Sequence, residues 1–173
     1  THMSDTRLIE AALAAGAAGA VLIPQRQIVL SAEFRRICEG NGCGYYGRCW
    51  MCPPDTGDIE TAMAQVRRYP WALLYQTIGA IEDSFDIEGM EERAREHARV
   101  SQRVQQAVRP LLQSRLCRTC ARRDGAPCRH PGQALPSLEG SGVDVYNTVK
   151  GTSLKYVNGR NTVTFFGMVL WEA

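Results

Sequence analysis

The sequence predicts an α/β chain of the α+β kind, in which a small central β-sheet is covered by helices and two cysteine-rich loops bind metal. Segments with helical spacing of apolar residues are mixed along the chain with segments rich in β-branched and aromatic residues. Seven cysteines fall into two tight groups, both placed between predicted elements. Because sites are usually built on connections, we expect both groups to be functional loops.

The chain has 173 residues and an apolar share of 45%, which suits one globular domain. No linker or low-complexity tract divides the sequence. Thr1 and His2 precede Met3, so residues 1–3 are interpreted as a cloning remnant and the start of the chain. We expect residues 4–173 to form a single cysteine-rich metal-binding domain.

The first half of the chain predicts, in order, a helix at 6–15, a strand at 20–23, an extended segment at 28–30, a helix at 32–39 and a helix from 56 or 58 to 68. Asp5 or Ser4 is expected to cap the first helix, and Gly16 to end it. The segment at 28–30 is expected to extend the first strand or to pair with it. The helix at 32–39 delivers Cys38 to the first cysteine loop.

The second half predicts a strand at 71–81, a long helix at 88–113, a short helix at 143–150 and a last strand at 162–171. The strand at 71–81 alternates too little for a surface strand, so we expect a central strand buried on both faces. His97 lies on the apolar stripe of the long helix, with Met90, Ala94, Val104, Val108 and Leu111. We interpret it as a packed, hydrogen-bonded histidine and not as a metal ligand.

The most apolar run, Ala11–Ile23, is shorter than the about 20 apolar residues that a membrane-spanning helix needs. A secretory signal is disfavoured because Asp5 and Glu10 crowd the only early cation, Arg7. We therefore expect a cytoplasmic chain with no membrane partner. Thiols stay reduced in that compartment, where grouped cysteines bind metal more often than they form disulfides.

The first cysteine group consists of Cys38, Cys43, Cys49 and Cys52, and the second of Cys117, Cys120 and Cys128. The first group supplies four thiols within one glycine-rich loop that is followed by two prolines, which suits a wrapped iron–sulfur cluster of the 4Fe-4S type. The second group supplies three thiols, so a cluster there leaves one iron open or takes another ligand such as His130. We expect one or two clusters.

Zinc is the alternative metal, because thiolates at short spacing suit it as well. Structural zinc sites usually have two paired arms of the Cys-x2–4-Cys kind, and the second group has one such arm, Cys117 with Cys120. In the first group the gaps are four, five and two residues. On the zinc alternative the chain is an adaptor or binding module without redox chemistry.

Cationic side chains flank the thiols, and we expect Arg48, Arg118, Arg129 and His130 to contact the bound cofactor. Nearby guanidinium groups lower thiol pKa values and favour the anionic cluster. A rival role for these arginines is contact with RNA, with Tyr45, Tyr46 and Trp50 stacking on bases. Nucleic acid is disfavoured because no zinc-knuckle repeat occurs and the formal net charge is only +2.

No Gly-x-Gly-x-x-Gly segment follows a strand, and no phosphate-binding Gly-Lys-Ser or Gly-Lys-Thr occurs. The sequence therefore gives no support to conventional hydrolases, kinases or dehydrogenases, and it leaves open whether the chain is an enzyme. The favoured function is electron transfer or redox activation. Its expected partner is a redox protein, or a small-molecule ligand at an open iron.

Several motifs occur in a fixed order, namely Cys38, Cys43 with Gly44, Tyr46 and Gly47, Trp50 with Cys52, Pro53 and Pro54, Cys117 with Cys120, Cys128 to Pro131, Pro136 with Ser137, and Gly142 to Val145. In these motifs the chain resembles the predicted metal-binding proteins of family DUF2284. The resemblance spans most of the chain and implies metal binding through six cysteines, without supplying a reaction. Cys49 stands outside the family pattern, so the first loop offers three ligands or four. With three ligands from each loop, both sites are incomplete or the two loops converge on one shared site.

Overall fold

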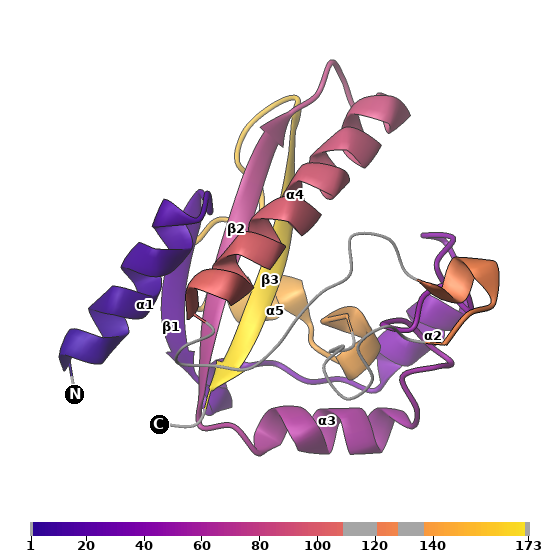
Figure 1. The fold of residues 1–173 in the computed structure, drawn as a ribbon, viewed down its shortest axis with the longest axis horizontal. Coiled ribbons are helices and arrows are strands. Elements are labelled where there is room, and N and C mark those ends of the chain that lie inside the picture. Colours follow the sequence, from indigo (N-terminus) through magenta and orange to yellow (C-terminus); the bar gives the residue numbers. More distant parts are fainter. Residues whose placement is uncertain (1, 109–120, 128–136, 172–173) are drawn as a thin grey trace.

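The computed structural model describes residues 2–108, 121–127 and 137–171. Within these residues a three-stranded antiparallel sheet, with strand order β1-β2-β3, carries helices on both faces (Figure 1). The elements are α1 (His2–Ala14), β1 (Gly19–Pro24), η1 (Gln25–Gln27), α2 (Glu33–Glu39), α3 (Ile59–Arg67), β2 (Trp71–Ala80), α4 (Ile87–Val108), η2 (Ala121–Asp124), η3 (Glu139–Ser141), α5 (Val145–Lys150) and β3 (Thr162–Trp171). The predicted α+β class with a small, helix-covered sheet is confirmed.

The middle strand of the sheet is β2, as predicted. Its whole length pairs with β3, from Trp71 opposite Trp171 to Ala80 opposite Thr162. The pairing with β1 covers only the first part of β2, from Trp71 to Gln76. The end of the sheet at 77–80 is therefore a two-stranded ribbon in the described part of the chain.

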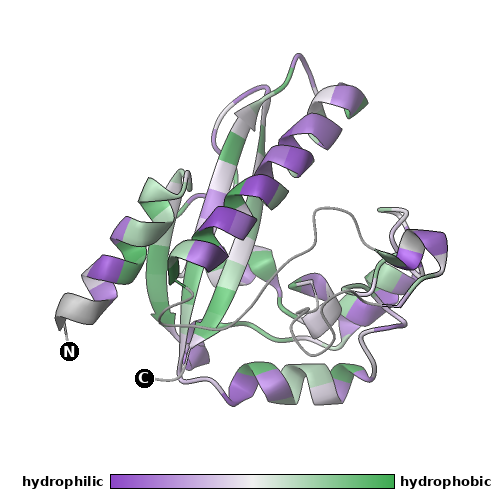
Figure 2. Ribbon diagram, viewed as in Figure 1, coloured by the Kyte–Doolittle hydropathy of each residue, from purple (hydrophilic) through white to green (hydrophobic). Residues whose placement is uncertain are grey.

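One face of the sheet packs against α1 and α4. Side chains alternate between the faces of a strand, so Leu73 and Tyr75 of β2 lie on this side together with Val169 of β3. They form one core cluster with residues of the two helices, Leu8, Ala12, Val100, Val104 and Val108. Figure 2 shows the hydrophobic strands behind the largely hydrophilic outer side of α4.

The other face packs against α3 and α5. The alternate residues of the strands, Ala72, Leu74 and Met168, lie here. Their partners are Ile23, Ile28, Val66, Val143, Val145 and Val149. The sheet thus has a core on each face. This fixes the register of the strands, because a slip by one residue would move each set of side chains to the opposite face.

An aspartate side chain caps the first turn of each of two helices. The Asp58 carboxylate accepts a hydrogen bond from the Thr61 backbone N–H at 3.0 Å and starts α3. Asp144 does the same for α5, with the Asn147 N–H at 3.0 Å. The predicted cap of the first helix is wrong, since α1 already begins at His2 and holds Asp5 in its first turn. A carboxylate there still stabilises the helix dipole.

The prediction that 28–30 joins the first strand is also wrong. The 3-10 turn η1 follows β1 directly, and it redirects the chain. Leu30 then forms an isolated bridge with Val143, just before α5. The local sequence pattern was strand-like, but its partner lies more than a hundred residues away.

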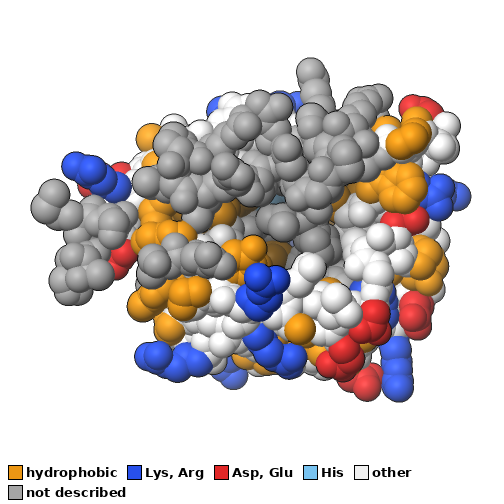
Figure 3. Space-filling view, turned by 60° about the horizontal axis from the view of Figure 1, so that its bottom comes forward, with side chains coloured by type: hydrophobic (Ala, Val, Ile, Leu, Met, Phe, Trp, Pro, Cys, Tyr) orange, Lys and Arg blue, Asp and Glu red, His pale blue; other side chains and the backbone are white. Residues whose placement is uncertain are grey.

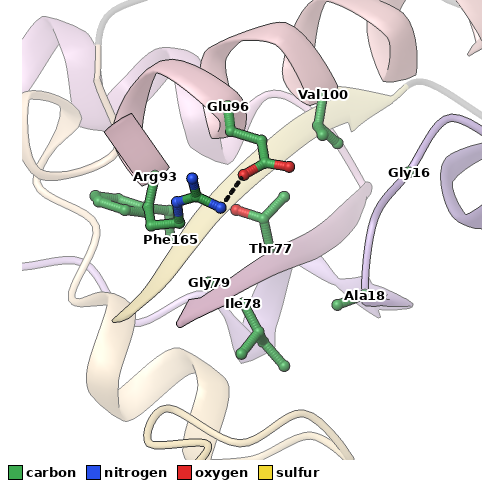
Figure 4. Close-up of a pocket in the computed structure, with 9 residues that line it drawn as sticks. All are labelled: Gly16, Ala18, Thr77, Ile78, Gly79, Arg93, Glu96, Val100 and Phe165. Atoms are coloured by element: carbon green, nitrogen blue, oxygen red, sulfur yellow. Dashed lines mark ion pairs between the residues drawn. The ribbon is translucent and has the colours of Figure 1, made fainter. Parts of the chain in front are cut away.

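The prediction that β2 is buried on both faces holds for only part of the strand. Residues 72–76 are buried, whereas Ile78 is 40% exposed. The reason is the two-stranded ribbon, where neither β1 nor a helix of the second face covers the side chains. Figure 4 shows Ile78 pointing away from α4 while Thr77 points toward it.

His97 lies between α4 and the sheet, in the packed role predicted from its sequence position. Its Nδ1 atom is 2.7 Å from the Thr77 hydroxyl, and its Nε2 atom is 3.3 Å from the Ser101 hydroxyl. The ring stacks between Tyr75 and Phe165, at centroid distances of 6.1 and 5.6 Å. The predicted extension of this helix from Val108 to Gln113 lies outside the described residues.

A small cavity of about 70 Å³ opens beside this histidine, with Thr77 and Phe165 in its lining (Figure 4). Arg93 and Glu96 of α4 form an ion pair across its rim at 2.9 Å. The aliphatic part of Arg93 lies over Gly79, where any Cβ atom would collide with it. The glycine in β2 is therefore required by the close approach of α4.

The stability of the fold should depend on the protonation of His97. Burial lowers the pKa of this imidazole from 6.5 to about 4. The unfolded chain then takes up a proton before the folded chain does, so the contribution of His97 to stability is complete well above pH 6.5 and is lost as the pH falls through 6.5 toward 4. At pH 5 the loss from this one group is about 2 kcal/mol.

Urea unfolding of the native chain and of His97→Gln at pH 7.5 and 5.0 measures this loss. The native chain should lose about 2 kcal/mol more than the variant between the two pH values. Equal losses in the two proteins would show that His97 is not the titrating group.

Candidate metal centre

The first cysteine group lies in a lobe beside the sheet, formed by α2, α3, η3 and the segment between α2 and α3 (Figure 1). Both α2 and α3 contact η3. Cys38 is in the last turn of α2, as the sequence predicted, and the other three thiols follow in the connecting segment. The helices thus fix one thiol, and the segment that leaves them carries the rest.

A set of short backbone hydrogen bonds folds this segment into a compact loop. The side chain of Asn41 accepts a bond from the Tyr46 N–H at 3.0 Å, and the Gly47 N–H donates to the Pro53 carbonyl at 2.9 Å. Gly44 and Gly47 have φ values of 74° and 66°. This left-handed conformation costs glycine little and most other residues considerably more, so the loop requires both glycines.

The backbone also turns sharply between Cys49 and Cys52, because the Cys52 N–H donates to the Cys49 carbonyl at 2.9 Å. The two thiols are close enough for a side-chain hydrogen bond. Pro53, the next residue, is fully buried and joins Pro54 through a cis peptide bond. The turn thus places two sulfur donors side by side on a buried support.

The four thiols of the first group form one electrostatic neighbourhood. The pKa of the Cys52 thiol is raised above its ordinary value, first by the hydrogen bond with Cys49, then by burial, and then by the charges of Cys49, Cys43 and Cys38. Burial likewise raises the pKa of the Cys38 thiol, with Cys43 as the next cause. The Cys52 thiol therefore lies within electrostatic range of the other three thiols of the group.

Arg35 ties the lobe together, a role that the sequence analysis did not assign to it. Its guanidinium donates to the Gly57 carbonyl at 2.6 Å and to the Gly140 carbonyl at 3.1 Å. Its positive charge also lowers the pKa of Cys38, against the larger effect of burial. The available signal was its position three residues before Cys38 on a helix, which places both side chains on one face.

The short segment 121–127 stands between Cys120 and Cys128 in the sequence, and it docks on the first cysteine loop. The indole N–H of Trp50 donates to the Ala126 carbonyl at 3.0 Å. The Arg122 guanidinium donates to the Asp55 carboxylate at 3.0 Å, and its centre lies 5.0 Å from the centroid of the Trp50 ring. We call these four residues, Trp50, Asp55, Arg122 and Ala126, the latch.

A further contact comes from the other end of the second cysteine segment. The Ser137 N–H donates to the Met51 carbonyl at 2.8 Å. Met51 lies between Cys49 and Cys52, so the chain meets the first loop both before Cys128 and after it. The latch and this bond join regions about 70 to 85 residues apart in sequence.

Six of the predicted site residues lie outside the described part of the chain: Cys117, Cys120, Cys128, Arg118, Arg129 and His130. Arg48 is described and exposed, and its backbone N–H bonds to the Tyr45 carbonyl. Trp50, for which the sequence also allowed stacking on RNA bases, is part of the latch instead. Arg122 occupies one side of its ring.

The donor set fits a soft metal, because thiolates are the ligands that zinc and iron–sulfur clusters prefer. None of the four described cysteines is in a disulfide. Within the described residues, however, no three side chains of His, Cys, Asp or Glu are arranged so that they could hold a single metal ion.

Charge on the surface is mixed. On the face drawn in Figure 3, cationic and anionic side chains both occur, with hydrophobic side chains between them. No helix in the described part of the chain has the length and apolarity needed to cross a bilayer.

Comparison with known proteins gives one match. A family model described as predicted metal-binding protein (DUF2284) matches residues 21–171, so the resemblance found in the sequence is confirmed. No curated protein matches the chain. No solved structure matches it either.

The latch should hold the segment 121–127 against the first loop. Asp55→Asn removes the charge that faces Arg122, in a pair whose side chains are only 15% and 32% exposed. A loss of about 1 kcal/mol raises the population of the undocked segment about fivefold. Limited trypsin digestion should then cleave after Arg122 about fivefold faster.

The control is Glu33→Gln, which removes the exposed ion pair with Arg36. Exposed pairs contribute little, so this variant should be cut at Arg122 at the native rate. An unchanged rate in Asp55→Asn would show that the ion pair does not hold the segment.

Proposed function

Because the chain belongs to the DUF2284 family of predicted metal-binding proteins, we propose that it binds an iron–sulfur cluster of the 4Fe-4S type and acts in electron transfer or redox activation. The observation that carries this proposal is the gathering of Cys38, Cys43, Cys49 and Cys52 in one electrostatic neighbourhood. Four thiols on one loop are the usual protein ligands of such a cluster.

The loop itself supports this assignment. Two glycines with positive φ let the backbone curl, and the buried Pro53 after Cys52 holds its end. Backbone N–H groups of such a loop are suited to hydrogen bonds with cluster sulfurs. Cys49, which stands outside the family pattern, is proposed as the fourth ligand because its side chain bonds to Cys52.

We also propose that Cys117, Cys120 and Cys128 bind metal close to the first loop. The support comes from the segment between the last two of these residues, which the latch holds on Trp50 and Asp55. Three thiols leave one coordination position for His130 or for a small-molecule ligand. The two groups then form either two adjacent sites or one shared site.

When bound, a 4Fe-4S cluster supplies one-electron redox chemistry. The chain's own residues hold the thiols in place and balance their negative charge. Arg35 lies near Cys38, and Arg122 is fixed against the loop by Asp55. Arg48, Arg118 and Arg129 are proposed to add positive charge around the cofactor, and a redox protein is the proposed partner.

Zinc is the second candidate, and a specific observation favours it. Cys49 and Cys52 form a tight Cys-x2-Cys turn, which is the usual arm of a structural zinc site. On this alternative the metal only stabilises the lobe, and the chain is an adaptor or binding module without redox chemistry.

Metal analysis decides between the two candidates. The full chain is purified without oxygen, and iron, acid-labile sulfide and zinc are measured per chain. We expect iron and sulfide in equal amounts, about four of each per cluster, with visible absorbance that bleaches on reduction. Stoichiometric zinc without sulfide would exclude the redox function and support the adaptor.

Cysteine variants test the ligand assignment. Cys52→Ala should lower the iron content of the purified chain by at least about half, because metal affinity depends on a complete set of thiolates. Met51→Leu is the matched control, since it changes the same turn and leaves every thiol in place. Native iron content in Cys52→Ala would reject this residue as a ligand.

A further inference from the structure

Two exposed surfaces of opposite charge occur outside the cysteine lobe. The first consists of the turn after β2 and the first two residues of α4, residues 82–88, which we call the acidic turn. It contains Glu82, Asp83, Asp86 and Glu88, with no cation among them. Two of its apolar side chains are held out in solvent, Phe85 at 86% and Ile87 at 64% exposed.

The acidic turn is fixed by its own hydrogen bonds. Asp86 accepts bonds from the backbone N–H groups of Glu82 and Gly89, at 2.9 and 2.7 Å. Asp83 accepts a bond from the Phe85 N–H at 2.7 Å. The carboxylates of Glu82 and Glu88 take part in none of the ion pairs among the described residues. The acidic turn thus presents two exposed apolar side chains and two carboxylates that are available to a partner.

The second surface is formed by α5, the segment after it and the start of β3, and we call it the basic aromatic surface. No Asp or Glu occurs between Val145 and Trp171. Its cations, Lys150, Lys155 and Arg160, are exposed and belong to no ion pair in the described part of the chain. Large charged groups left without partners indicate a surface that is available to an anionic partner.

The same surface carries aromatic rings. Tyr156 stacks on Phe166 of β3 at 5.6 Å, and Tyr146 of α5 meets Tyr156 edge-on at 5.3 Å. Tyr146 is 53% and Tyr156 44% exposed. Tyrosine and phenylalanine are enriched in the cores of protein interfaces, where they bury a large area with few rotatable bonds.

The acidic turn and the basic aromatic surface are neighbours. The Asn161 side chain donates to the Glu82 carbonyl at 2.8 Å, and the Ile81 N–H donates to the Asn161 carbonyl at 3.0 Å. Figure 1 shows the connection before β3 reaching the same end of the sheet as the turn after β2. Exposed Ile78, on the face of the sheet opposite α4, adds to the apolar area at this end (Figure 4).

From this arrangement we propose that a second copy of the chain docks here, related by a two-fold axis, with the acidic turn of each copy against the basic aromatic surface of the other. A two-fold axis brings the same patch of both copies together. A patch that is acidic on one side and basic on the other is then complementary to itself. Phe85 of each copy meets the exposed tyrosines of its partner.

A single-stranded nucleic acid is the competing occupant, because it would use the same tyrosines and cations. The contiguous acidic turn disfavours it, since Glu82 and its neighbours would repel phosphate groups. The dimer uses both charged halves of the patch. It is independent of the metal, so the proposed function and this inference can fail separately.

Analytical ultracentrifugation of the full chain, purified without oxygen, tests the dimer. At low salt the native chain should show a concentration-dependent mass that approaches twice that of one chain, and added salt should weaken the association. Two double charge reversals, Glu82→Lys with Glu88→Lys and Lys155→Glu with Arg160→Glu, should each raise the dissociation constant by at least about tenfold. An equimolar mixture of the two variants should associate again, because the reversed charges of one variant then face reversed charges of opposite sign in the other.

The control is Glu10→Lys with Glu60→Lys. It makes the same change of net charge at exposed positions, and Glu60 occupies the first turn of α3 as Glu88 does that of α4. It should associate as the native chain does. A chain that is monomeric at all concentrations, or a mixture that fails to associate, would overturn the proposal. Binding of a fluorescent oligouridine that Lys155→Glu with Arg160→Glu abolishes, without self-association, would assign the surface to nucleic acid instead.

Discussion

The cost of forming a thiolate at Cys52 is the constraint on which the cysteine lobe depends. Each thiolate that forms near Cys52 opposes the next, and burial adds to this cost. The surrounding structure offsets it with positive charge and fixed backbone. Arg35 donates to two carbonyl groups and its charge lowers the pKa of Cys38, while Asp55 holds Arg122 against the loop. A bound cation is the remaining way to relieve the repulsion, which is why the arrangement fits a metal centre.

The sheet determines where this lobe can lie. Strand β2 is paired on both sides over its first six residues and packs into a separate core on each face. On one face α1 and α4 fill the surface, and on the other α5 and α3 do so. The helix that follows the cysteine loop, α3, therefore joins the lobe to the body of the molecule, with Val66 in the second core. The lobe is anchored through α3, η3 and the bridge between Leu30 and Val143.

Most helices and strands could be predicted from the sequence, because their signals are local. Capping by Asp58 and Asp144 and the apolar stripe of α4 each depend on residues a few positions apart. The predictions failed where the structure depends on contacts between residues that are far apart in the sequence. Leu30 finds its partner at Val143, and Ile78 is exposed because β1 begins opposite Gln76 and does not reach Ile78. In the site the cysteines were evident from their spacing, whereas Asp55 and the role of Trp50 depend on a segment some seventy residues away.

The separation of the cysteine lobe from the two cores has a consequence for the metal-free protein. None of the four described cysteines belongs to either core cluster, and the sheet packs against its helices through the aliphatic and aromatic side chains of these clusters. Chelation should thus unfold α2 and the cysteine loop together and leave the body of the molecule folded, with α3 packed on it. In such an apoprotein the body would be folded while the cysteine loop remained open to an incoming cofactor. Insertion of the cofactor would then require folding at only one end of the molecule.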